Sequence, residues 1–400
     1  MDRIAIVYDV GAATPTEILT SLENMAEPIF VLPESEQNGE LANLLSDFAT
    51  VASFESITKF DLQGVLTFSD YQLERAAKLA YKLGLPFHSR EAAANITRKF
   101  RQRTILNERG VDSTATALLT DAASAAIAAK TVPLPGVVKP NRGFGGTNTY
   151  LVESVDEFAK LVDKILDDNT LYPDEGYVLE TLITGADIEP PWGNYISVES
   201  VVYAGEINHL DITGKLALAP PFREQGSFLP ARTDLFDEST VLELTSKALA
   251  ALDVGDSICH TEIKLTDGGP RIIEVNGRLG HPIYDLFKRA HNIDLIQVAA
   301  CVALGMEPSI KIGPCEKVVY HYFGLPPVGV SFLDSIPGIE QLRAQPEVDQ
   351  LALLIQPPSL LDWRRGFQER IYTCTGSVPN HQAISDFVTR IDEVLAISYL

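Results

Sequence analysis

The sequence predicts a mixed α/β and α+β protein, in which a parallel βαβ region comes first and antiparallel strands follow. In the first 90 or so residues, apolar runs such as IAIVYDV (4–10) and GVLTFSD (64–70) alternate with helical patterns, as βαβ units do. Beyond residue 110, runs rich in Val, Ile and Tyr flank glycine-containing turns, which is typical of antiparallel hairpins. The two patterns predict more than one domain.

The length of the chain also favours several domains, since 400 residues correspond to roughly two to four of them. We expect an N-terminal βαβ domain, a central region, a subdomain with further antiparallel strands and a small C-terminal α+β lobe. The expected bounds are 1–90, 91–185, 186–312 and 313–400. No GxGxxG follows the first strand, so dinucleotide binding of the usual kind is not expected.

Composition narrows the class of partner. A hydrophobic content of 46% describes a globular chain, and a formal charge of −22 disfavours nucleic acid or an anionic membrane as a partner. The four cysteines are scattered without a CxxC pair, which predicts reduced thiols. The start MDRIAIVYDV does not resemble a signal peptide, and no apolar run is long enough to span a membrane. We therefore expect a cytoplasmic protein.

The stretch HTEIKLTDGGPRIIEVNGR (260–278) carries the strongest chemical signal. Two strand patterns flank TDGG, and a turn centred on Gly268 places Glu262 directly opposite Glu274. Like charges in that position repel. Strand period two puts Asn276 and Arg278 on the same face as Glu274. A divalent cation held by two carboxylates and an amide would turn the repulsion into a ligand set.

Three upstream features are weaker when each is taken alone. Lys139 ends a strand before NRGFGG, where Gly143, Gly145 and Gly146 would let the backbone approach phosphate oxygens, although a plain hairpin loop is the simpler interpretation. Lys99 and Arg103, four residues apart on one helix face, would either meet a phosphate or form a solvated basic face. The strand that ends at Glu180 could present a carboxylate to an adenine edge, or it could be an ordinary strand.

The order of these features is informative. A helix lysine, a strand lysine with a glycine-rich loop and a strand ending in Glu precede a hairpin with the pattern E-x11-E-x-N-G-R. Over residues 85–310 the sequence resembles the ATP-grasp superfamily, and specifically its carboxylate–amine ligases that join amino acids into dipeptides. The resemblance implies the ATP-grasp fold, with an N-terminal βαβ domain before it and a small C-terminal lobe.

The resemblance also implies roles for individual residues. Phosphates of ATP would be bound by Lys99 and Lys139, and the loop 142–147 would close over them. Glu180 and Leu182 would contact adenine, and Asp187, or alternatively Glu199, would bind ribose. Two Mg²⁺ ions, or Mn²⁺ in their place, would be held by Glu262, Glu274 and Asn276, and Arg278 would face the transferring phosphoryl group. Candidates for the substrate pocket are Glu224, Arg232, His281 and Tyr284, and Glu224 is alternatively a candidate for binding a metal.

The function implied is an ADP-forming ligase. ATP would convert a carboxylate, that of an amino acid, into an acyl phosphate, which an amine would attack to give a dipeptide or amide. The chemistry requires charge neutralisation and positioning, which metal, Arg and Lys supply. Glu274, Lys139 and Arg278 would be the catalytic residues. The alternatives are a biotin-carboxylase-like or purine-pathway ATP-grasp enzyme, or a non-catalytic nucleotide-binding regulator.

Some residues are assigned a plainer role. We interpret His260 as a packed core histidine, His209 as structural or pocket-lining, and RRGFQER (364–370) as a solvated face. Phe228 stands where a histidine is frequent in the resembling enzymes, and LGHP (279–282) brings His281 towards the acceptor site. The expected partners are small molecules. A homodimer is common in the resembling enzymes, and the sequence leaves the oligomeric state open.

Overall fold

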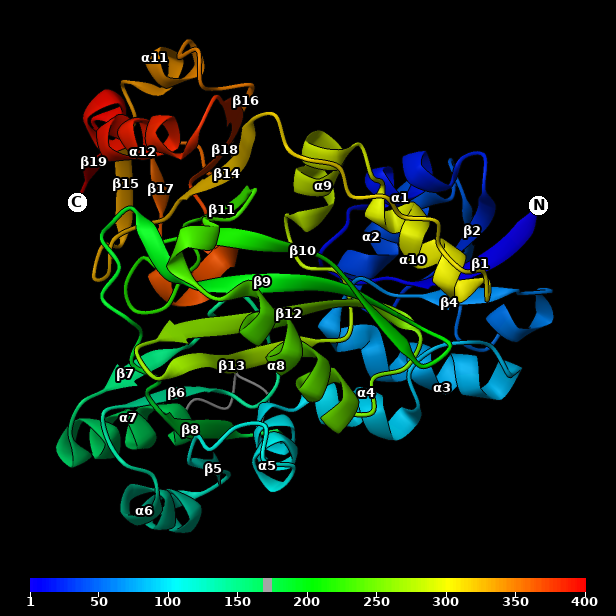
Figure 1. The fold of residues 1–400 in the computed structure, drawn as a ribbon, viewed down its shortest axis with the longest axis horizontal. Coiled ribbons are helices and arrows are strands. Elements are labelled where there is room, and N and C mark those ends of the chain that lie inside the picture. The colour runs from blue at the N-terminus through cyan, green and yellow to red at the C-terminus, as the bar shows by residue number, and fades with distance from the viewer. Residues whose placement is uncertain (168–174) are drawn as a thin grey trace.

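The computed structural model describes residues 1–167 and 175–400 (Figure 1). The strands in this described part form a four-stranded sheet at the N-terminus, a second four-stranded sheet, an eight-stranded sheet and a small three-stranded sheet. This mixture of α/β and α+β parts is the one that the sequence predicts. None of the helices within the described ranges is long and apolar enough to cross a membrane.

The N-terminal sheet is parallel, as expected, with the strand order β3-β2-β1-β4. Ile4, Ala5, Ile6 and Val7 are fully buried because both faces of the sheet are covered. One of the helices that cover the sheet comes from far along the chain. It is α10 (Leu295–Ala303), which packs on α1 (Pro15–Leu22) and β4 (Gly64–Leu66) (Figure 1). The elements are β1 (Asp2–Val7), α1 (Pro15–Leu22), β2 (Ala26–Val31), α2 (Glu36–Leu45), β3 (Thr50–Ala52), a 3₁₀ turn (Ile57–Lys59), β4 (Gly64–Leu66), a second 3₁₀ turn (Asp70–Gln72) and α3 (Leu73–Leu83).

The helical stretch expected over 90–109 is two helices, α4 (Arg90–Thr97) and α5 (Lys99–Glu108). Arg98 between them is extended, with φ −106° and ψ 109°. Asn141 caps the second helix, because its carbonyl accepts from the N–H of Lys99 and its side chain from the N–H of Phe100. The break therefore fixes Lys99 at a helix start beside the loop that follows Lys139.

The second four-stranded sheet has the order β5-β8-β6-β7 and is antiparallel, with α6 and α7 packed on it. Neither β5 nor α6 is among the elements predicted from the sequence. Asp121 begins α6 as its N-cap, accepting from the N–H of Ser124. The elements are β5 (Thr116–Leu119), α6 (Ala122–Thr131), β6 (Gly136–Pro140), β7 (Tyr150–Val152), α7 (Val155–Asp167) and β8 (Tyr177–Thr181).

The eight-stranded sheet has the order β13-β12-β9-β10-β11-β14-β18-β16, and every neighbouring pair is antiparallel. Strands from both sides of the expected boundary at residue 312 thus belong to one sheet. The elements are β9 (Trp192–Tyr203), β10 (Glu206–Leu216), β11 (Gly226–Leu229), a 3₁₀ turn (Thr233–Leu235), α8 (Glu238–Ala251), β12 (Ser257–Thr266), β13 (Gly269–Asn276), α9 (Ile283–His291), α10 (Leu295–Ala303), β14 (Val318–Gly324), β16 (Gln350–Leu353) and β18 (Tyr372–Val378).

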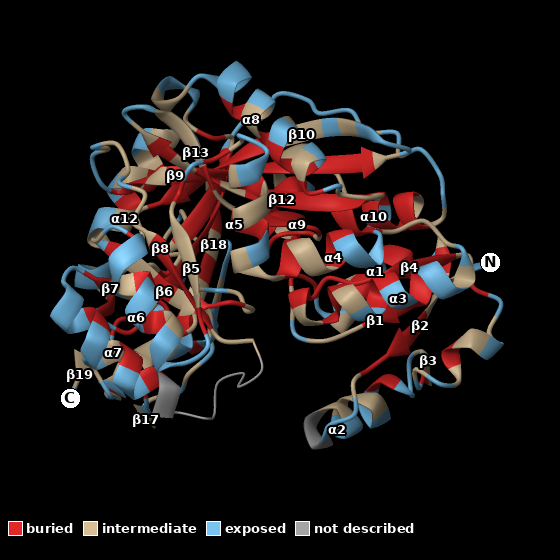
Figure 2. Cartoon of the chain, turned by 90° about the horizontal axis from the view of Figure 1, so that it is seen from below, coloured by how far each residue is buried: buried red, intermediate tan, exposed pale blue. Residues whose placement is uncertain are grey.

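The end of the chain adds α12 and the small sheet β17-β15-β19. Figure 2 shows that the strands of the large sheet are mostly buried. Cys259 and Cys374 are buried, and all four cysteines are free, as predicted. The remaining elements are β15 (Phe332–Ser335), α11 (Ile339–Arg343), β17 (Ser359–Leu360), a 3₁₀ segment (Trp363–Glu369), α12 (His381–Leu395) and β19 (Ser398–Tyr399).

Candidate active site

The hairpin of β12 and β13 places Glu262 directly opposite Glu274, as the sequence predicts. Both side chains are partly exposed, by 30% and 20%. Burial opposes the ionisation of Glu262, but contact with His260 and the charge of Lys215 lower its pKa to about 2. Glu262 is therefore ionised at neutral pH, as a metal ligand must be.

The turn of this hairpin differs from the expected one. Thr266 pairs with Gly269, so no single residue stands at the centre, whereas we expected Gly268 there. An undisturbed ladder from that turn would offset the two glutamates by one residue. A β-bulge in β13 adds Ile273 to one strand and restores their opposition. The predicted pairing is correct, but the predicted turn was wrong.

Helix α5 binds the free edge of β13. The side-chain amide of Gln102 pairs with both the N–H and the C=O of Val275, at 2.8 Å each. Arg103 donates to the carbonyls of Ile272 and Ile273, both at 2.8 Å, and so supplies hydrogen bonds to the backbone carbonyls at the bulge. Arg103 is 3% exposed, which makes it a structural residue rather than the phosphate ligand or solvated face considered from the sequence.

The same helix carries Lys99 to the hairpin. Its Nζ makes an ion pair with Glu274 and donates to the carbonyl of Gly143 at 2.8 Å. Lys99 therefore links a carboxylate of the hairpin to the glycine-rich loop.

Lys139 and Glu180 come from neighbouring strands of the second four-stranded sheet. Glu180 lies opposite Val137, two residues before Lys139, so both side chains are on one face. The Nζ of Lys139 lies 2.8 Å from one carboxylate oxygen of Glu180, and the Nε of Arg103 lies 3.1 Å from the other. Burial alone would raise the pKa of Glu180, but these two cations lower it to about 2.

The glycine-rich loop after Lys139 needs its glycines. Gly143, Gly145 and Gly146 have φ of 148°, 66° and 69°, which residues with a Cβ rarely adopt. The carbonyl of Gly145 accepts from the N–H of Phe367 at 2.7 Å, and the carbonyl of Arg364 accepts from the N–H of Asn148 at 2.8 Å. The run 364–370 is thus packed against this loop, and its interpretation as a solvated face was wrong.

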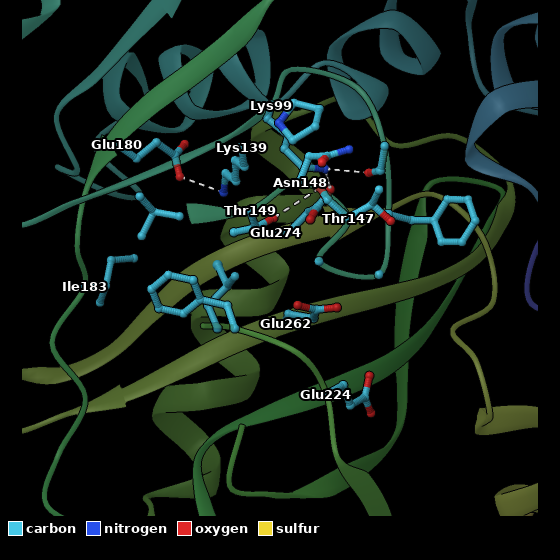
Figure 3. A pocket seen from close by; sticks show the side chains of 18 of the residues that line it. Lys99, Lys139, Thr147, Asn148, Thr149, Glu180, Ile183, Glu224, Glu262 and Glu274 are labelled. Atoms are coloured by element: carbon cyan, nitrogen blue, oxygen red, sulfur yellow. Dashed lines mark hydrogen bonds and ion pairs between the residues drawn. The ribbon is translucent and has the colours of Figure 1, made fainter. Parts of the chain in front are cut away.

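A pocket lies between these parts (Figure 3). Figure 3 shows Lys139 and Glu180 near one another, with Glu262 and Glu274 on the hairpin and Glu224 further away. Of the residues singled out from the sequence, the pocket is lined by Lys99, Arg103, Lys139, Gly143, Gly145, Gly146, Glu180, Leu182, Glu224, Glu262 and Glu274.

Asn276 is the last residue of β13, Arg278 follows two residues later, and neither lines this pocket. Arg278 forms an ion pair with Asp70 at the end of the N-terminal sheet, with the Nε to Oδ2 distance 3.1 Å. Its Nη2 also donates to the Oδ1 of Asn276 at 3.2 Å, and Asn276 donates to the carbonyl of His260. Within the described ranges, no three His, Cys, Asp or Glu side chains are grouped to hold a metal. The predicted set has two carboxylates and an amide, which are hard oxygen donors that suit Mg²⁺.

Neither candidate for ribose binding lines the pocket. Asp187 is exposed in the loop between β8 and β9. Glu199 is 1% exposed in β9, and both of its oxygens lie 2.9 Å from the Nδ1 of His260. Burial would lower the pKa of His260, but the charge of Glu199 raises it to about 9. His260 is therefore a buried ion-pair partner, and its Nε2 also lies 3.6 Å from Glu262.

The residues predicted to line the substrate pocket lie in different parts of the structure, and only some of them reach the pocket. Glu224 reaches the pocket and accepts from the Nζ of Lys215 at 2.8 Å. Arg232 lies over the Trp192 ring and pairs with Asp234, away from the pocket, because it follows β11 at the far end of the strand. Tyr284 is buried against α1, where its hydroxyl lies 3.2 Å from that of Ser21. The structure does not bring these two to the pocket.

His281 lies against the segment 364–370. Its ring packs against Phe367 with centroids 5.1 Å apart, and its Nδ1 is buried without a hydrogen-bond partner among the described residues. Burial first, and then the charges of Arg370, His321, Lys215 and Arg278, lower the pKa of His281 well below its usual value.

Sequence reasoning missed several residues of the site. Tyr195, Lys264 and Phe222 line the pocket, and Asp70 orients Arg278. Strand periodicity could have indicated Lys264, which is two residues from Glu262 on the same strand face. Nothing in the sequence links Asp70 to Arg278, since 208 residues separate them. His209 is structural, as interpreted, with hydrogen bonds to Ser200 and Ser246.

The chain is similar in sequence to several known proteins. No protein-family model matches the chain. Carnosine synthase 1 of Homo sapiens is 26% identical over 307 residues, covering 71% of this chain but only 35% of that protein. The L-arginine-specific L-amino acid ligase of Bacillus subtilis is 22% identical over 363 residues, covering 87% of this chain and 82% of that one.

Solved structures agree in fold. The L-amino acid ligase of Bacillus licheniformis superposes with a TM-score of 0.78 at 20% identity, covering 100% of this chain and 99% of that chain. The carboxyaminoimidazole ribonucleotide synthase of asperigillus clavatus, complexed with ATP, superposes with a TM-score of 0.72 at 13% identity, covering 99% and 98%. The chain has the ATP-grasp fold, and amino acid ligases are among the proteins that it is similar to in sequence.

Proposed function

We propose that this chain is an ATP-dependent ligase that joins the carboxylate of an amino acid to an amine and releases ADP and phosphate. The observation that carries the proposal is the pair Glu262 and Glu274, opposed across one hairpin with Lys99 beside them. Placing two carboxylates opposite each other costs free energy because they repel, and a bound cation would offset this repulsion. Relatives that are amino acid ligases support the same conclusion.

ATP would lie along the pocket from Glu180 to the hairpin. Leu182 and Ile183 would supply apolar contact for adenine, next to Glu180. Both carboxylate oxygens of Glu180 already accept from cations, but an ionised carboxylate has about four acceptor sites, so it can still accept from an amino group. Lys139 and Lys99 would meet the phosphates, and the backbone of the loop 142–147 would cover them.

Glu262, Glu274 and Asn276 would hold Mg²⁺, or Mn²⁺ in its place. A divalent cation there supplies charge neutralisation for the triphosphate. The oxygen donors of this set fit such an ion, and Lys99, already paired with Glu274, would share the negative charge.

Arg278 would stabilise the phosphoryl group in transfer to the substrate carboxylate. Its ion pair with Asp70 fixes its orientation before substrate binds, so that little rearrangement is needed during the reaction. The carboxylate becomes an acyl phosphate, whose phosphate leaves when the amine attacks the carbonyl carbon. The closed glycine-rich loop would keep water from the acyl phosphate.

A substrate panel tests the proposal. ADP, AMP and phosphate would be measured with single and paired amino acids, together with product mass. ADP release that needs two amino acids, with a product one water lighter than their sum, is the expected result. Release of AMP, or dependence on bicarbonate, contradicts it and favours another ATP-grasp reaction.

The cytoplasmic location and the homodimer remain predictions. Cell fractionation would test the first and light scattering of the purified chain the second.

A further inference from the structure

Arg370 follows the segment that packs against the glycine-rich loop. Gly366 in this segment is buried with φ 58°, and a Cβ there would lie 2.3 Å from the carbonyl oxygen of Gly145. The N–H of Phe367, three residues before Arg370, donates to the carbonyl of Gly145 at 2.7 Å. The position of Arg370 is therefore fixed by the same contacts that hold the loop.

Among the described residues, the guanidinium of Arg370 has no anionic partner. It lies 3.7 Å from the ring centroid of Phe367 and 5.6 Å from that of Phe323, while its Nε is buried without a hydrogen bond. Burial lowers the pKa of Arg370 to about 10, and the nearby charge of Glu224 only partly opposes this.

Other arginines with buried guanidinium groups differ from it. Arg103 is bound by Asp112 and Glu180, and Arg278 by Asp70. Arg223 has no carboxylate but donates to the carbonyls of Pro220 and Pro326. Among the arginines that the structure describes and that are not exposed, Arg370 alone has neither an ion pair nor a hydrogen bond. A buried cation left unpaired is costly, so a ligand that supplies the anion would be strongly favoured.

The surroundings locate this cation relative to the proposed reaction. The electrostatic influence of Arg370 reaches His281 and Glu224, and that of Arg278 also reaches His281. Glu224 lines the pocket of the two lysines, whereas Arg370 does not. Arg370 thus lies outside the lining of that pocket but within electrostatic reach of Glu224.

The chemistry of the proposed ligation indicates which anion would bind to Arg370. When two amino acids are joined, the carboxylate of the first is the reacting group, so it lies at the phosphate. The second amino acid attacks through its amine and keeps its carboxylate. We propose that Arg370 binds the free carboxylate of the amino acid that supplies the amine, with His281 beside it; this inference rests on the proposed function.

Kinetics of Arg370→Gln test the inference. Each amino acid that serves as the amine in the panel would be compared with its carboxamide, in which –CONH₂ replaces the carboxylate. Loss of a charge-assisted contact should lower kcat/KM for the free acid by about 10- to 100-fold, mainly through KM, and change the carboxamide little. Arg370→Lys should restore part of the activity with the free acid, because it keeps the charge.

Two controls separate binding from a general defect. Arg365→Gln removes an exposed arginine of the same segment, paired with Glu369, and should keep the wild-type preference for the free acid. Hydroxylamine, an amine without a carboxylate, should give hydroxamate at the wild-type rate in Arg370→Gln. Equal losses with free acid, carboxamide and hydroxylamine would assign Arg370 a structural role and overturn the inference, as would no loss at all.

A measurement without turnover keeps the inference distinct from the proposed function. Phenylglyoxal would be used to modify arginines, and peptide mass mapping would follow Arg370. Pooled L-amino acids should protect Arg370, and their pooled carboxamides should not. If no pair of amino acids releases ADP, the proposed function fails; protection by amino acids alone would still support a carboxylate site, and its absence would overturn it.

Discussion

Lys99 and Glu274 form an ion pair that joins the start of α5 to the metal-binding face proposed for the β12–β13 hairpin. The pair exists because α5 begins one residue after an extended Arg98 and is capped by Asn141. It couples the hairpin to the loop, since the same Nζ donates to the carbonyl of Gly143. Changes at either residue should affect nucleotide binding more than folding.

Glu274→Gln should abolish ATP turnover, with a loss of at least about 100-fold, because a neutral amide is a poor ligand for Mg²⁺. Raising the Mg²⁺ concentration should recover part of the rate. Rates of ADP release at several Mg²⁺ concentrations would measure this. Glu243→Gln, at an exposed glutamate of α8 paired with Lys247, is the control. Wild-type activity in Glu274→Gln would refute the metal assignment.

Asp70→Asn should lower kcat by about 10- to 100-fold and leave KM for ATP within about twofold, because it removes the charge that orients Arg278. Steady-state kinetics with varied ATP would separate the two constants. Asp47→Asn, at an exposed aspartate of the same N-terminal domain, should behave as wild type. An increase in KM for ATP without a change in kcat would place Arg278 in nucleotide binding instead.

Acid should destabilise the chain through Glu180. Its pKa is lowered from 4.5 to about 2 in the folded protein, so its contribution is present above pH 4.5 and is lost as the pH falls towards 2. The shift corresponds to about 3 kcal/mol of the free energy of unfolding. Urea denaturation at several pH values between 6 and 3 would measure this loss of stability. Glu180→Gln should flatten this part of the profile; an unchanged slope would contradict the assignment.

Gly366→Ala should weaken the closed position of the glycine-rich loop. The added Cβ would clash with the backbone of Gly145 and Gly146 and strain a φ of 58°. Hydrogen exchange of residues 142–149 should accelerate, and more ATP should be hydrolysed per product formed. Gly329→Ala is a matched control, because Gly329 has φ 85° but nothing within 4 Å of an added Cβ. Equal effects of both substitutions would attribute the change to backbone strain alone.

The sequence by itself determined the parallel N-terminal sheet, the opposed glutamates and the order of the two lysines, the glycine-rich loop and Glu180. These depend on local patterns, namely strand and helix periods and turn residues, which act over a few positions. It also predicted the ATP-grasp fold, because the proposed metal-binding pattern of the hairpin lies within 19 residues. It did not find β5 and α6, whose residues lack a strong period.

Only the tertiary structure decided how these parts meet. The bulge at Ile273 depends on Arg103, which reaches it from a helix about 170 residues earlier. The pairing of Arg278 with Asp70 and the packing of residues 364–370 on the glycine-rich loop join segments that are more than 200 residues apart. The charged run RRGFQER looked like a solvated surface because composition reports polarity but not contact. Arg370 is packed against residues that are distant in the sequence, such as Phe323, and no local pattern encodes such contacts. Its guanidinium therefore has no ion pair among the described residues, although the sequence predicts an exposed side chain.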